Sequence, residues 1–257
     1  MSSTEHQSDP QSFKFPEKLK KDSIIEAICE VRFVCDELEE LVIGRLIDKT
    51  PWKEHNRTRL PIADIPSPIR QADQNLKYQP VFELKDKSKL QIVKIGGNVI
   101  SFHVLSPYCG WNEFQPLLGE VIETLITNID NVSITRIGLR YINALTNDDH
   151  HINNVADLKL KISVGRNDSF PHSLNLNFMR KESDYSAVVR IASPEFITGT
   201  YIPHLAALVD VDISTSDNFN TSDSSIAKSW IEKAHFIEKD EYFNLIPDNI
   251  LDLLKEK

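Results

Sequence analysis

Apolar and polar residues alternate along several stretches of this chain, and the alternation restricts its fold to one built on a half-buried sheet. Between residues 24 and 34, the charged side chains of Glu26, Glu30 and Arg32 share one face of an extended strand. The opposite face is apolar and carries Ile25, Ala27, Cys29, Val31 and Phe33. The pattern predicts a strand with one face in a core and one face in water.

Similar patterns predict a series of further strands. We expect them at residues 77–84, 89–95, 98–105, 132–145, 158–164, 174–181, 185–192 and 206–214. Residues 89–95 and 98–105 are joined through Gly96 and Gly97, and glycine supplies the positive φ that a tight hairpin needs. The prediction is therefore a hairpin closed by these two glycines.

Helical periodicity is strongest between residues 112 and 129. Apolar residues recur there at intervals of three and four, which is typical of a long helix packed on a core. A shorter amphipathic helix is expected at 37–49. The C-terminal region predicts one helix with Ser222 as its N-cap and another that opens at Pro247. Residues 50–75 contain four prolines, so we expect an irregular stretch, either a surface excursion or a lid.

The order of these elements predicts an α+β protein. Each half supplies a mainly antiparallel sheet followed by a packing helix, which suggests two related halves that share one core. The expected boundaries are a disordered tail at 1–16, a first half at 17–130 and a second half at 131–257.

Composition and charge limit the classes of function. The 257 residues are 40% hydrophobic and carry a net charge of −9, which is typical of a folded globular chain and argues against generic nucleic-acid binding. No stretch approaches the ~18 consecutive apolar residues of a membrane span. The three cysteines, with no paired C-x-x-C spacing, fit a reducing cytoplasm and favour neither disulfides nor a zinc site.

Four motifs together resemble a known group of proteins. They are I-I-E-A with E-V-R-F at 24–33, P-Y-x-G-W at 107–111, R-I-G-L-R-Y-I-N at 136–143, and V-D-V-D-I at 209–213 with His235 and Phe243. In order and spacing they are similar to a sporadically distributed family of prokaryotic proteins of about 250 residues. The resemblance implies a single cytoplasmic domain with no established activity, cofactor or catalytic residue.

Charged side chains on the strand faces are the candidate binding residues. Seven of them recur at every second position of their strands: Glu26, Glu30, Arg32, Arg136, Arg140, Asp210 and Asp212. If these strands are neighbours, Arg136 and Arg140 flank Gly138 and could hold phosphate, while the acids could hold Mg²⁺. The register resembles the E-x-E-x-K signature of triphosphate-tunnel enzymes, except that Ile28 and Arg32 depart from it. The competing interpretation is cross-strand ion pairing that needs no ligand.

Two smaller features have both a chemical and a structural interpretation. The run from Asp148 to His151 could bind a divalent ion, although adjacent loop residues rarely converge on one metal and a solvated turn is favoured. Cys109 directly precedes the long helix, where a helix N-terminus could activate its thiol, but Tyr108 and Trp111 favour a packed turn.

No complete catalytic motif is present, and we therefore expect a binding module rather than an enzyme. The leading hypothesis is a cytoplasmic accessory protein that binds a partner protein through its Pro-rich loop or its edge strands, with no cofactor and no metal. A homodimer is compatible with it, and so is a role in a defence or toxin–antitoxin system. The alternative is an Mg²⁺-dependent phosphohydrolase or nucleotide-binding protein that uses the charged strand faces.

Overall fold

Nine strands pair into one antiparallel sheet in the computed structural model, which describes residues 15–16, 19–48, 52–88, 90–163, 173–198 and 202–255. In chain order they are β1 (Ile24–Val34), β2 (Asn56–Arg59), β3 (Phe82–Lys85), β4 (Gln91–Ile95), β5 (Val99–Leu105), β6 (Ser133–Thr146), β7 (Asn175–Lys181), β8 (Tyr185–Ala192) and β9 (Leu205–Thr215). Across the sheet the order is β2-β3-β4-β5-β1-β6-β9-β8-β7. The chain is therefore an α+β protein with β1 and β6 at its centre.

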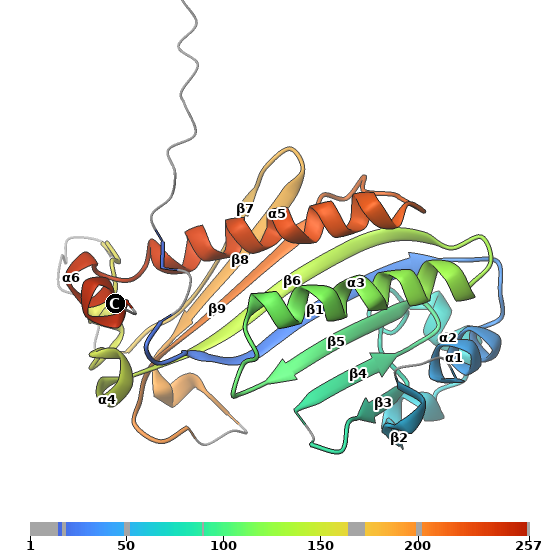
Figure 1. Ribbon diagram of the computed structural model, residues 1–257, viewed down its shortest axis with the longest axis horizontal. Coiled ribbons are helices and arrows are strands. Elements are labelled where there is room, and N and C mark those ends of the chain that lie inside the picture. The colour runs from blue at the N-terminus through green and yellow to red at the C-terminus, as the bar shows by residue number, and fades with distance from the viewer. Residues whose placement is uncertain are drawn as a thin grey trace, which may run out of the picture.

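Two long helices, α3 (Trp111–Asn128) and α5 (Ser224–Phe243), lie across one face of the sheet (Figure 1). The shorter helices are α1 (Glu39–Asp48), α2 (Ser67–Ala72), α4 (Asn147–His150) and α6 (Asp248–Leu254), with 3₁₀ turns η1 (Trp52–Glu54), η2 (Pro61–Asp64), η3 (Val155–Asp157) and η4 (Pro194–Phe196). None of the described helices is both long and apolar enough to cross a bilayer.

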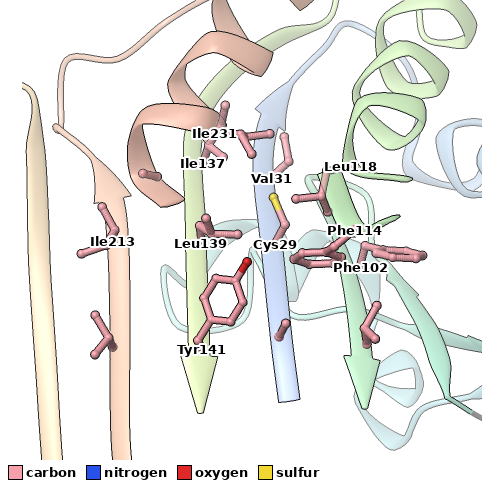
Figure 2. Packing of buried hydrophobic residues seen from close by; sticks show 14 of the residues in the cluster. Cys29, Val31, Phe102, Phe114, Leu118, Ile137, Leu139, Tyr141, Ile213 and Ile231 are labelled. Carbon is pink, nitrogen blue, oxygen red and sulfur yellow. The ribbon is translucent and has the colours of Figure 1, made fainter. Parts of the chain in front are cut away.

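The core lies between the central strands and the two long helices. Figure 2 shows the side chains that meet there: Cys29, Val31, Ile137, Leu139 and Tyr141 from the strands, and Phe114, Leu118 and Ile231 from the helices. Burying each such side chain stabilises the fold by about 1.5–3 kcal/mol before the entropy cost of ordering it. Because β-strand side chains alternate, this packing leaves the charged side chains of β1 on the uncovered face.

Most of the expected elements are confirmed. The strand predicted at 24–34 is β1, and the helix predicted at 112–129 is α3 with its bounds one residue earlier. The strands expected at 132–145, 174–181, 185–192 and 206–214 correspond to β6, β7, β8 and β9. These runs were predictable because each has one apolar face that must be buried.

Three local expectations are wrong. No strand forms at 158–163, and residue 164 lies outside the described residues. The strand expected at 77–84 begins only at Phe82, since residues 74–78 form a turn. Helix α5 is capped by Asp223, whose carboxylate accepts from the Ser225 amide, while Ser222 instead donates to the Val132 carbonyl.

The stretch at 50–75 is more regular than its prolines suggested. It contains η1, β2, η2 and α2, and Trp52 in it is 1% exposed. The α2 residue Arg70 is buried and its guanidinium binds Glu39 of α1 at 2.5 Å. These two anchors hold the segment against the domain.

The hairpin between β4 and β5 is confirmed, but its glycines serve another purpose. Neither Gly96 nor Gly97 has a positive φ. A Cβ at Gly96 would lie 2.8 Å from the Gln79 carbonyl oxygen, and one at Gly97 would lie 2.6 Å from Glu39 Cγ. The positions require glycine because neighbouring segments approach too closely for a side chain.

The strand order is symmetrical about the β1/β6 pair except for β2, which has no counterpart beyond β7 in the described part of the chain. β1 is flanked by β5, β4 and β3, and β6 is flanked by β9, β8 and β7, so each central strand neighbours the strand that precedes a long helix. One cluster of buried apolar residues draws members from both sides. The duplication into halves at 17–130 and 131–257 stays a prediction. Of the expected tail at 1–16, only Phe15 and Pro16 are described, and Phe15 stacks on Phe243 at 5.3 Å.

Candidate functional site

The seven charged residues singled out from the sequence lie together on the sheet face opposite α3 and α5. They come from the neighbouring strands β1, β6 and β9, in a register that sets Glu30 opposite Gly138, and Arg140 opposite Asp212. We call this set the charged ladder: Glu26, Glu30, Arg32, Arg136, Arg140, Asp210 and Asp212. The three strands that carry the charged ladder are therefore neighbours in the sheet.

The ladder is internally paired. Arg140 binds both carboxylate oxygens of Asp210, at 2.7 and 2.6 Å, and this interaction raises the pKa of Arg140. Glu30 accepts from Arg136 at 2.9 Å and from Arg32 at 2.7 Å. Glu26 binds His103 of β5 at 2.7 Å, and that hydrogen bond lowers the pKa of the Glu26 carboxyl. Each cation that might hold phosphate already contacts a carboxylate.

Arg136 also occupies the space above Gly138. A Cβ placed on Gly138 would lie 2.8 Å from Arg136 Nη1, so the guanidinium covers the glycine that was expected to admit an anion. The same guanidinium lies 3.8 Å from Asp212, whose pKa is raised by burial. No cluster of three or more metal-ligating side chains occurs in the described part of the chain. This arrangement is that of cross-strand ion pairs, which contribute about 0.2–1 kcal/mol each.

The side chains of Asp148 to His151 do not converge on one metal site. His150 is buried, and its Nδ1 accepts from the Thr146 amide at 3.1 Å. Asp148 is exposed and lies 4.0 Å from His204, while His151 adopts a left-handed conformation at the end of α4. The side chains point in different directions, so this segment is a structured turn.

Cys109 lies in a packed turn. Burial is the main cause that raises the pKa of its thiol, which is the opposite of activation by a helix N-terminus. Gly110, next along the chain, has φ of 88° and leads directly into α3, a conformation that favours glycine. The turn therefore fixes how the chain enters α3.

A cavity on the helix side of the sheet is the feature that sequence reasoning missed. It has a volume of about 1170 Å³ and lies where the start of β1, β6, the beginning of α3 and the second half of α5 meet. None of the charged ladder lines it. The lining residues that matter below are Asp22, Ser23, Tyr108, Trp111, Tyr141, Asn143, His235, Glu238, Lys239 and Tyr242.

Aromatic rings form much of the cavity wall. The hydroxyl oxygens of Tyr108 and Tyr141 lie 3.2 Å apart, and their rings meet edge to face with centroids 5.7 Å apart. The Trp111 ring stacks on the His235 imidazole with centroids 3.9 Å apart and 9° between planes. Burial raises the pKa of both tyrosines, so their hydroxyls stay neutral.

A hydrogen-bonded triad lies at the β1 end of the cavity. Ser23 Oγ donates to Asn143 Oδ1 at 2.8 Å and lies 2.7 Å from Tyr242 Oη. Because the serine hydroxyl has one proton, the Tyr242 hydroxyl donates to it. Asn143 Nδ2 is buried without a partner among the described residues. The triad ties β1 to β6 and α5.

Glu238 is the unusual group of the cavity. Its side chain projects from α5 where the residue is 5% exposed, and its carboxyl has neither a hydrogen bond nor an ion pair within the described ranges. Burial raises its pKa to about 8, with Lys239 acting in the opposite direction. At neutral pH this carboxyl is therefore mostly protonated. The sequence did hold a signal: Glu238 follows Ala227, Ile231 and Ala234 on the apolar face of α5.

His235 completes the set of buried polar groups. Burial lowers its pKa to about 3, so its imidazole is neutral, and its Nδ1 is buried with no partner in the part of the chain described. Buried polar atoms are normally hydrogen-bonded, and unpaired ones cost free energy. Two such atoms, Asn143 Nδ2 and His235 Nδ1, belong to residues that line this cavity.

Comparison with protein-family models finds no matching family, and comparison with curated proteins finds no similar protein. The resemblance noted from the sequence motifs stays a prediction.

Proposed function

We propose that this chain is a binding protein that takes a small organic ligand into the cavity between α5, the start of α3 and the central strands. The observation that carries this proposal is the Glu238 carboxyl, which lines the cavity, is 5% exposed and has no partner among the described residues. Folding leaves such a group unpaired at a cost in stability, and sites that bind ligands are where such costs recur.

The composition of the cavity wall supports binding of an organic molecule. Ligand sites are concave and mostly apolar, with a few polar groups that set orientation. Here the rings of Tyr108, Trp111 and Tyr141 supply the apolar wall, and Glu238 supplies a polar group. The volume of about 1170 Å³ accommodates a ligand of drug size or larger.

Ligand-observed NMR tests this function. Saturation transfer to 2-phenylethylamine, 2-phenylethanol and phenylacetate compares a cation, a neutral molecule and an anion with the same ring. We expect transfer to at least one of them, and loss of that transfer in Ser23→Trp, which places a large ring in the cavity. Lack of transfer to all three compounds would contradict the proposal. Asp48→Asn, on the exposed end of α1, is the control.

A partner protein is the second candidate, and the outer edge of β7 favours it. No other strand of the described chain pairs with that edge, and Met179 on it is 58% exposed. An extended segment of a partner could add to such an edge through main-chain hydrogen bonds. A pull-down with this chain as bait should capture a protein that is encoded beside it. The Met179→Lys variant should fail to capture the same protein. Light scattering distinguishes a second copy of this chain from a foreign partner.

The Mg²⁺-dependent alternative has weaker support. The carboxylates and arginines that it requires bind one another in the charged ladder.

A further inference from the structure

We propose that the ligand of this cavity is an organic cation, an ammonium group held against tyrosine and tryptophan rings and neutralised by the Glu238 carboxylate. This inference rests on the proposed function and adds the chemical class of the ligand. It follows from the combination of aromatic rings and one unpaired acid on the wall of the same cavity.

The rings around Glu238 come from three separate parts of the chain. Tyr108 precedes α3, Tyr141 lies on β6 and Tyr242 is one helical turn after Glu238 on α5. The Glu238 carboxyl interacts electrostatically with all three phenols. Aromatic faces carry negative potential and attract cations, most of all where water is excluded. The tertiary structure thus places a carboxyl and three tyrosines on the wall of one cavity.

The carboxyl is the complementary charge that such a cation needs. With the cavity empty, burial keeps Glu238 protonated, because an ionised carboxylate without a partner is costly in an apolar site. An ammonium group beside it favours the ionised form. Binding at neutral pH should therefore release a proton from Glu238 to solvent, and the ammonium and carboxylate charges then compensate each other.

Glu238 is the group expected to titrate between about pH 6 and pH 9. The tyrosines and Cys109 have raised pKa values because they are buried, and burial holds the pKa of His235 far below this range. The other titratable groups on the wall are Asp22 before β1, Tyr108 and Cys109 before α3, Glu113 of α3, Tyr141 of β6, His235, Lys239 and Tyr242 of α5, and Lys255 at the end of α6.

Lys239 is the feature that would favour an anion instead. Its ammonium group lies 5.9 Å from the centre of the Phe243 ring, and its charge lowers the pKa of Glu238. An anion would meet the negative faces of the rings and would require Glu238 to remain protonated. The two ligand classes therefore predict opposite pH dependence, since a cation binds more tightly as pH rises and an anion more weakly.

Isothermal titration calorimetry with 2-phenylethylamine, 2-phenylethanol and phenylacetate tests the inference on the full-length protein. The amine should bind more tightly than the alcohol, and its affinity should rise about tenfold from pH 6 to pH 7 because only ionised Glu238 is competent. Measured in buffers of different ionisation enthalpy, binding of the amine near pH 7 should release close to one proton.

Glu238→Gln is the matched variant, because a neutral amide replaces a neutral acid of the same shape. It should keep the melting temperature of the natural protein near pH 5, where Glu238 is protonated. It should weaken binding of the amine by about tenfold or more at pH 8, and abolish both proton release and the pH dependence of binding. If this variant does not fold, the pH profile and proton release of the natural protein still decide the question.

Other outcomes overturn the inference in distinguishable ways. Equal binding of the amine and the alcohol, or tighter binding of phenylacetate, would reject the cation while leaving a ligand-binding cavity intact. Binding of the amine that Glu238→Gln does not weaken would place the cation elsewhere. Absence of binding by all three compounds would reject the proposed function together with this inference.

Discussion

The guanidinium of Arg140 binds both carboxylate oxygens of Asp210. Asp210 lies two positions before Asp212, the β9 residue directly opposite Arg140. The side chain of Asp210 is 7% exposed, and that of Arg140 is 37% exposed. Arg140 therefore compensates the negative charge of a carboxylate that is almost completely buried in the sheet. The charged ladder, which was attractive as a ligand site, has a structural role at this point.

Removal of Arg140 should expose that role. Arg140→Met leaves the Asp210 carboxylate buried, with Arg190 at 3.9 Å as its remaining cation among the described residues. We expect a loss of about 2–3 kcal/mol in the free energy of unfolding. The double variant Arg140→Met with Asp210→Leu should recover most of it. Arg190→Met is the control, and it should change stability by less than about 0.5 kcal/mol. Urea denaturation measures all three, and a negligible effect of Arg140→Met would contradict the assignment.

The charged ladder should not respond to Mg²⁺ and nucleoside triphosphate. Because Arg136 covers Gly138 and binds Glu30, a phosphate would have to displace these contacts. We expect no shift in melting temperature when both are added. An increase in melting temperature that is lost in Arg136→Ala would show that the charged ladder binds the ligand. That result would support the phosphohydrolase alternative.

Alanine substitutions at Gly97 and at Gly44 should change the free energy of unfolding in opposite directions. The Cβ of Gly97→Ala would lie 2.6 Å from Glu39 Cγ, and Glu39 is held by buried Arg70. We expect a destabilisation of about 1–3 kcal/mol, typical of overpacking. Gly44 lies inside α1 with nothing within 4 Å of a Cβ, so Gly44→Ala should stabilise by about 0.5–1 kcal/mol through helix propensity. Thermal unfolding of the two variants checks the pair, and equal effects would contradict this interpretation of the hairpin.

Stability should depend on pH through Glu238. Its pKa is about 8 in the folded chain against an ordinary value of 4.5, so between these limits the folded state retains a proton that the unfolded state has lost. The contribution of Glu238 to stability is therefore complete below pH 4.5 and falls as pH rises, by up to about 1.4 kcal/mol per pH unit.

Comparison with Glu238→Gln isolates this effect from that of His235. The pKa of His235 is lowered to about 3 from 6.5, so its contribution has the opposite slope and falls as pH drops below 6.5. The natural protein should lose stability relative to Glu238→Gln from pH 5 to pH 8. Parallel stability profiles for the two proteins in chemical denaturation would show that Glu238 is not buried as a neutral acid.

The sequence alone determined the helices and strands in which apolar residues follow one clear periodicity. The bounds of β1 and α3 could be predicted because each has an apolar face. The same alternation placed each of Glu30, Arg136 and Asp212 on the polar face of its own strand. The strand wrongly expected at 158–163 and the missed strand β2 lie where local β propensity or proline content disagrees with the packing of the fold. Packing depends on distant residues, so a local sequence pattern does not reveal it.

Tertiary structure alone decided what the polar groups do. Whether Arg136 faces an open site or Glu30 depends on the register of β1 against β6, and a shift by one residue would change every partner. The cavity depends on the contacts of Ser23 with Asn143 and Tyr242, which lie 120 and 219 positions away along the chain. Burial and pairing are properties of neighbours in space, so the protonated Glu238 emerges only when the chain has folded around it.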